Sequence, residues 1–158
     1  VIITGQIGYY SGSLQVTNVT RTNVKVQSMK DQDKISIEEV QDLKTYIADE
    51  QKVGNIIKMT TPLTITSYYD ATAEDSNAST LTATYKDANG VTQRITIRID
   101  ANIALFDENG DRITSGSYFK GKTFKELTCI VGYYDPSQDE THNGSIQLML
   151  TKMSDIVY

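Results

Sequence analysis

The chain has little of what most active sites and disulfide scaffolds are built from: no tryptophan, one cysteine, one histidine and two prolines in 158 residues. A single cysteine excludes an internal disulfide and a cysteine-based zinc site. The single histidine, His142, lies in a polar turn beside Asn143 and Gly144, so no histidine-based triad can be assembled from strand positions. We therefore predict that the protein is not an enzyme and that it holds no cofactor and no metal.

Long hydrophobic runs and positive charge are also scarce. No apolar run approaches the roughly 20 residues that a membrane-spanning helix needs, so we expect no membrane-spanning segment. Asp and Glu outnumber Lys and Arg by 20 to 15, which gives a formal net charge of -5. An acidic surface does not attract nucleic acid or anionic lipid as a whole, so any site for such a ligand must be local.

What the chain does have is strand patterns, with a composition typical of a globular protein: 39% hydrophobic and 22% charged residues. The clearest hairpin spans 80–99, where apolar residues alternate on both sides of Asp87–Gly90 and Asn89-Gly90 supplies the turn. Cys129 lies in a similar apolar alternation, which predicts a buried, inert thiol. Further strands are expected at 55–69, with Pro62 marking an edge, bend or bulge, and at 126–134 and 145–151.

One helix is expected, at about 36–48. Ser36 with Glu39 three residues later matches a capping box. The apolar residues that follow recur at helical spacing: Ile37, Val40, Leu43, Tyr46 and Ile47.

A repeat joins the two ends of the chain. Gly8-Tyr9-Tyr10 matches Gly132-Tyr133-Tyr134, and Ser13-Leu14-Gln15-Val16 matches Ser145-Ile146-Gln147-Leu148. The match continues to Thr22-Asn23-Val24 and Ser154-Asp155-Ile156, and the turn accounts for the difference in length. If 126–158 closes a barrel, the first copy is the closing hairpin of a preceding unit.

These features predict a mainly β fold: a closing hairpin of a partial repeat at 1–26, a linker and helix at 27–52, and a five-stranded barrel at 53–158. The Ile37-Glu38-Glu39-Val40 pattern and the Gly-Tyr-Tyr, turn, Gln-Leu hairpin carry a resemblance to a known group. The chain resembles the tandem OB-fold modules of bacterial secreted, lipid-anchored or nuclease-associated proteins. The resemblance implies a location outside a bacterium or on its surface.

An OB-type barrel binds ligands across its second and third strands. Alternation in the 80–99 hairpin points Lys86, Arg94 and Arg98 outward with several threonines. Tyr68 and Tyr134 are candidates for stacking, because one ring of each adjacent tyrosine pair faces outward. We take these residues as a candidate site for single-stranded nucleic acid or polysaccharide. A solvated sheet face explains the same basic pattern, and one ring of each tyrosine pair could fill the barrel end while the other lies on the surface.

The sequence also fits two other interpretations, a structural or adhesive role and calcium binding. The chain could be a structural or adhesive surface module that binds protein or glycan. Two polar loops hold acids that could offer oxygen ligands to calcium, without the spacing of a known calcium loop: Asp70, Glu74 and Asp75 in one, and Asp135, Asp139 and Glu140 in the other.

The first hairpin needs a partner, because an isolated hairpin with an apolar face is marginal in water. Its apolar residues are Ile3, Ile7, Tyr9, Leu14 and Val16. A preceding barrel, the resident barrel and a second copy of the chain are the three candidates. We expect the hairpin to pack on the resident domain or across a homodimer.

Overall fold

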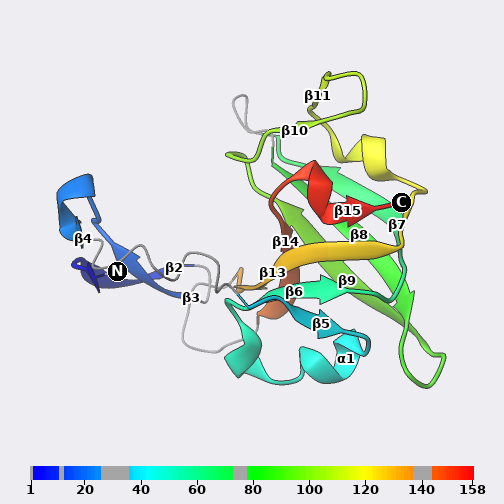
Figure 1. Ribbon diagram of the computed structural model, residues 1–158, viewed down its shortest axis with the longest axis horizontal. Coiled ribbons are helices and arrows are strands. Elements are labelled where there is room, and N and C mark those ends of the chain that lie inside the picture. The colour runs from blue at the N-terminus through cyan, green and yellow to red at the C-terminus, as the bar shows by residue number, and fades with distance from the viewer. Residues whose placement is uncertain (1, 11–12, 26–35, 73–77, 137–143) are drawn as a thin grey trace. The chain divides into compact units, whose positions relative to one another are not determined.

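The computed structural model describes residues 2–10, 13–25, 36–72, 78–136 and 144–158. The described chain is mainly β, as the sequence predicts, with one short α-helix and several 3-10 turns (Figure 1). It divides into two compact units: residues 1–36 with 133–145, and residues 37–132 with 146–158.

One large, curled sheet dominates the second unit. Its strands are β5 (Glu38–Val40), β6 (Ile56–Met59), β7 (Leu63–Asp70), β8 (Ser79–Lys86), β9 (Thr92–Ile99), β12 (Thr123–Phe124), β13 (Glu126–Tyr134), β14 (Ser145–Leu150) and β15 (Ile156–Val157). The strand order is β12-β7-β8-β9-β14-β13-β6-β5, with β15 paired to β13 outside this path. Most neighbours are antiparallel, but β14 runs parallel to β9 and β5 runs parallel to β6.

The sheet curls into a half-barrel because one predicted strand is broken in two. The pattern at 55–69 forms β6 and β7, with Thr60–Pro62 between them, where a proline that lacks an N–H favours the break. β6 pairs with β13 whereas β7 pairs with β8. The two halves of this segment therefore lie toward opposite ends of the strand order, and the short connection draws those ends together.

The core lies on the inner side of the curled sheet. Alternate residues of the β8–β9 hairpin point inward, as predicted, and the turn has Gly90 at a φ of 74°. Phe119 and Phe124 pack edge to face, with ring centroids 5.8 Å apart, in the same core. The inward residues of the hairpin are Leu81, Ala83, Tyr85, Ile95, Ile97 and Ile99.

The helix predicted at 36–48 is wrong in its extent. Glu38–Val40 is strand β5, and helix α1 covers only Leu43–Tyr46. The N-cap is Asp42, whose carboxylate accepts hydrogen bonds from the backbone N–H and the hydroxyl of Thr45, and not Ser36. Val40 and Leu43 are buried in the observed strand and helical turn, and the same spacing would place them on one face of a longer helix, so apolar spacing alone did not distinguish the two.

Two smaller features close the ends of the larger unit. β10 (Leu105–Phe106) and β11 (Arg112–Ile113) form a hairpin around the turn predicted at Asp107–Asp111. The 3-10 helix η3 (Gly116–Phe119) follows it. Figure 1 shows these elements at one end of the curled sheet and α1 at the other. The short 3-10 turns η2 (Glu50–Lys52) and η4 (Met153–Asp155) complete the unit.

The N-terminal hairpin forms as predicted. β2 (Gln6–Tyr10) pairs antiparallel with β3 (Ser13–Thr17). β1 (Ile2–Ile3) pairs with β4 (Val24–Lys25), which follows the 3-10 turn η1 (Arg21–Asn23). Ile3, Ile7 and Val16 are all exposed, so the hairpin does not bury these apolar side chains within itself.

Candidate binding face

The outer surface of β7, β8 and β9, called here the β7–β9 face, brings the three predicted basic residues together. Register pairs Thr80 with Arg98, Thr84 with Arg94, and Lys86 with Thr92. Since the alternating residues of both strands are buried, all six of these side chains belong to the opposite, outer face. β7, β8 and β9 lie side by side in Figure 1.

Hydroxyl groups surround the three cations. The Arg98 guanidinium donates a hydrogen bond to the Thr80 hydroxyl at 3.0 Å, and the Lys86 ammonium donates to the Thr92 hydroxyl at 2.6 Å. Within the described part of the chain, none of the three cations forms an ion pair. Their charge is therefore available to an anionic ligand.

Tyr69 is the aromatic residue on the outward positions of β7, and Tyr68, the predicted stacking residue, alternates with it and is 39% exposed. A bulge between Ile65 and Ser67 shifts the alternation of β7. As a result Tyr69 stands opposite Thr80 on the outer face, whereas Tyr68 stands opposite the buried Leu81. Tyr69 is 62% exposed. The sequence alone does not show which of two adjacent tyrosines points outward, because one extra residue in the strand reverses the sides on which they lie.

Tyr134, the other predicted stacking residue, lies at the end of β13, and its side chain is exposed. It belongs to the unit formed by 1–36 and 133–145, whereas β7, β8 and β9 belong to the other unit. In its own unit, the neighbouring Tyr133 hydroxyl accepts a hydrogen bond from the Gly144 N–H at 3.0 Å. The adjacent Tyr133 therefore helps to hold the base of the long turn.

Asp70 anchors the end of β7 beside Tyr69. Its carboxylate accepts hydrogen bonds from the Ser79 hydroxyl at 2.6 Å, the Ser115 hydroxyl at 2.6 Å and the Gly116 N–H at 2.8 Å. Burial by itself raises the pKa of Asp70, but these hydrogen bonds outweigh burial and lower the pKa below its ordinary value. The carboxylate thus ties β7 to β8 and η3 and fixes the backbone that carries Tyr69.

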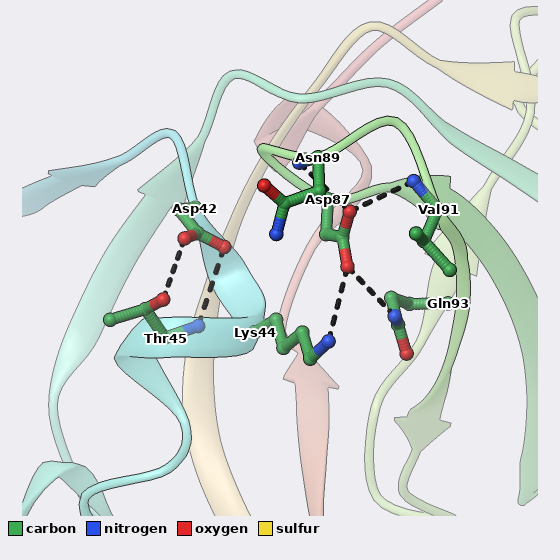
Figure 2. Close-up of polar contacts among 7 residues, drawn as sticks. All are labelled: Asp42, Lys44, Thr45, Asp87, Asn89, Val91 and Gln93. Atoms are coloured by element: carbon green, nitrogen blue, oxygen red, sulfur yellow. Dashed lines mark hydrogen bonds and ion pairs between the residues drawn. The ribbon is translucent and has the colours of Figure 1, made fainter.

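Asp87 holds the turn at the opposite end of the β8–β9 hairpin (Figure 2). One oxygen accepts from the Asn89 and Val91 N–H groups, and the other accepts from the Gln93 amide at 2.8 Å and from Lys44 at 3.2 Å. Burial raises the pKa of this carboxyl, but the donors outweigh it and lower the pKa to about 2. The Lys44 contact also connects α1 to the turn.

The β7–β9 face carries positive charge only. Asp70 and Asp87 lie at the strand ends and are directed away from it. The outward positions of the described strands β7, β8 and β9 carry no Asp or Glu. They carry one tyrosine, three cations and a row of hydroxyls: Thr64, Ser67, Thr80, Thr82, Thr84, Thr92 and Thr96. A locally basic, hydroxyl-rich surface with one exposed ring is therefore present on a protein whose net charge is -5.

The acidic loops give no metal site in the described residues. Within residues 2–10, 13–25, 36–72, 78–136 and 144–158, no three His, Cys, Asp or Glu side chains gather to hold an ion. Asp107 instead accepts hydrogen bonds from the N–H groups of Asn109 and Asp111 in the predicted turn. The remaining candidates Glu74, Asp75, Asp139 and Glu140, and also His142, lie outside the described residues.

Cys129 is buried, as predicted, and burial raises the pKa of its thiol to about 12. Such a thiol is protonated at neutral pH and does not act as a nucleophile. The described residues also contain no helix that is both long and apolar enough to cross a membrane.

Comparison with known proteins gives no match: no family model, no curated protein and no solved structure aligns with this chain.

Proposed function

We propose that the protein is a non-catalytic binding module of an exported bacterial protein, built on an OB-type barrel, which contacts single-stranded nucleic acid or another extended anionic polymer through the β7–β9 face. The observation that carries the proposal is the row Tyr69, Thr80 and Arg98 across three paired strands. Stacking by an aromatic ring next to a phosphate-binding arginine is how proteins hold single strands without reading their sequence.

The strand order supports the OB-type assignment. If β6 and β7 count as one interrupted first strand, then β8, β9, β13 and β14 follow as the second to the fifth. The spatial order β7-β8-β9-β14-β13-β6 is then first, second, third, fifth, fourth and first again. The third and fifth strands are parallel. This order is the one expected of a five-stranded Greek-key barrel of the OB type, and it therefore supports the proposal that the second and third strands form a ligand-binding face.

Fluorescence anisotropy with a labelled oligo(dT) tests the proposal, with titrations repeated from 20 to 200 mM salt. Each phosphate contact contributes about 0.7 to the slope of log affinity against log salt for single strands. The Arg94→Ala/Arg98→Ala double variant should therefore flatten the slope by about 1.4. The double variant Arg112→Ala/Lys120→Ala changes the net charge equally at two exposed cations elsewhere and should leave the slope near that of the parent.

Tyr69 separates stacking from general charge attraction. Tyr69→Ala should weaken oligo(dT) binding by about 1–3 kcal/mol, whereas Tyr69→Phe keeps the ring and should bind almost as the parent does. If the unmodified protein binds no oligonucleotide at low salt, nucleic acid is excluded as the ligand. Titration with polygalacturonate, an anionic polysaccharide, then asks whether the same arginines hold a different polymer.

A structural or adhesive role, in which the module acts as a spacer and binds protein or glycan, is the second candidate. The duplicated hairpin favours this role, because repeats joined in a row build an extended structure and need no catalytic or ligand-binding site. Neutral glycan or protein binding that is insensitive to Arg94→Ala/Arg98→Ala would favour this role over the first.

A further inference from the structure

The N-terminal hairpin repeats the closing hairpin of the barrel strand for strand. β1 pairs with β4 in the register Ile2 to Lys25 and Ile3 to Val24. β13 pairs with β15 through the residues that the sequence repeat makes equivalent: Glu126 with Val157 and Leu127 with Ile156. The 3-10 turns η1 and η4 also occupy equivalent positions, each ended by the N–H of the next residue bonding back to its first carbonyl.

A glycine makes the same close approach in both copies. A Cβ added to Gly8 would lie 2.8 Å from the Thr17 side chain, and one added to Gly132 would lie 2.9 Å from the Met149 side chain. Gly8 and Gly132 are equivalent, and so are Thr17 and Met149. Besides the sequence repeat, the two hairpins thus share the pairing of their flanking strands, a 3-10 turn and a close contact at a glycine.

The two copies differ in what covers their apolar side chains. Val131 is 1% exposed and its equivalent Ile7 is 68% exposed; Leu148 is fully buried and its equivalent Val16 is 48% exposed. In the second copy, β6 pairs antiparallel with β13 and β9 pairs parallel with β14. Among the residues that the structure describes, β2 and β3 pair only with each other and have no equivalent of these two strands.

The side chains on the other surface of the hairpin fit this comparison. Ile2 corresponds to Glu126, whose carboxylate pairs with Lys58 at 2.8 Å on the outside of the barrel. The position equivalent to Ile2 therefore tolerates a charge, whereas the positions equivalent to Ile7 and Val16 are buried. By this comparison, the surface with Ile7 and Val16 is the one that a partner covers, and the surface with Ile2 is the one that faces water.

A second copy of this chain is a poor occupant, because its β6 and β9 are already paired with its own β13 and β14. We propose that the open face of the N-terminal hairpin closes a second barrel of the same kind, whose strands equivalent to β6 and β9 lie upstream of Val1 in the same polypeptide. In the resident barrel the closing hairpin follows β6–β9 in sequence, so the strands that the first hairpin closes must precede it.

Hydrogen exchange compares the 158-residue chain with the natural polypeptide extended upstream of Val1. In the extended polypeptide, the amides at the outer edges of β2 and β3 should exchange at least about 100-fold more slowly, because they gain strand partners. Equal exchange in the two proteins would overturn the proposal, as would a coding sequence with no room upstream for four strands.

Matched substitutions then identify the surface. Ile7→Glu should leave the 158-residue chain folded as before but unfold the upstream barrel of the extended polypeptide, and Ile2→Glu should be tolerated in both. A similar effect of the two substitutions would contradict the assigned orientation. If the 158-residue chain dimerised with increasing concentration and Ile7→Glu abolished the dimer, the partner of this surface would be a second copy of the chain. The proposal of an upstream barrel would then fail.

Discussion

Replacing Asp70 tests how the end of β7 is held. Its two carboxylate oxygens accept three hydrogen bonds, from Ser79, Ser115 and Gly116, and Ser79 is buried. Asp70→Ala leaves a buried hydroxyl and a backbone N–H without an acceptor. Each such group costs about 1–3 kcal/mol, and these costs are not additive, so we expect a loss of about 3 kcal/mol in the free energy of unfolding.

Asp70→Asn should cost less, about 1–2 kcal/mol. The amide oxygen can still accept from Ser79 and Gly116, and the amide nitrogen can donate to the Ser115 hydroxyl after that hydroxyl rotates. The difference between the two variants thus separates loss of charge from loss of acceptors.

The pH dependence follows from the lowered pKa of Asp70. A carboxyl whose pKa is lower in the folded state than its ordinary 3.8 stabilises the fold fully above pH 3.8. This stabilisation is lost as the pH falls through the folded-state pKa. The deficit of Asp70→Asn relative to the parent should therefore be constant from pH 5 to 7 and shrink below pH 4.

Urea unfolding followed by far-UV circular dichroism measures both effects. Asp111→Asn is the control, since this exposed acid accepts no hydrogen bond through its side chain in the described structure, and it should change stability by less than about 0.5 kcal/mol. If Asp70→Ala were as stable as Asp111→Asn, the three hydrogen bonds would not hold β7 as argued.

Three further predictions concern the fold around the face. Asp87→Asn should lower the Tm at pH 7 by removing the carboxylate that organises the turn, and the difference should disappear as the pH falls from 3.8 toward 2, because the folded-state pKa is about 2; Lys44→Gln, which removes an exposed partner, should change the Tm little. A deficit that persists unchanged at pH 2 would contradict this. Gly116→Ala should cost about 1–3 kcal/mol in urea unfolding, since the new Cβ would lie 2.9 Å from both the Leu81 Cδ2 and the Tyr68 Cβ; a neutral result would mean that η3 shifts freely. The Cys129 thiol should react with a disulfide reagent at the rate at which the barrel opens, and rapid labelling of the native protein at pH 8 would show that the thiol is not enclosed.

Local patterns predict the strands of this protein well, because side-chain alternation and turn residues act over a few positions. The β8–β9 hairpin needs only its apolar alternation and Asn89-Gly90. The same local information fails at β5 and α1. There Val40 is held as a strand by pairing with β6, a contact that no local pattern contains.

The sequence places the cations of the candidate site on one strand face, but it does not determine which of the two adjacent tyrosines shares that face. Arg94 and Arg98 lie on one face because β9 is regular along its whole length. Which tyrosine points outward depends on the bulge between Ile65 and Ser67. The segment Thr64–Ser67 contains no glycine from which the bulge could have been predicted. A strand of ordinary composition can hold a bulge whenever its two halves must follow neighbours at different curvature.

The two hairpins also show which part of the fold is local in origin. Both copies adopt the same pairing between their flanking strands and the same 3-10 turn. Yet the apolar side chains of one copy are buried and those of the other are exposed. The same register therefore occurs with the apolar side chains buried and with them exposed, which is expected if the glycine contact, the 3-10 turn and the strand alternation help to set it. If each unit is completed by the segment that follows its other strands, as we propose, then barrel closure stabilises a hairpin that already has the required register.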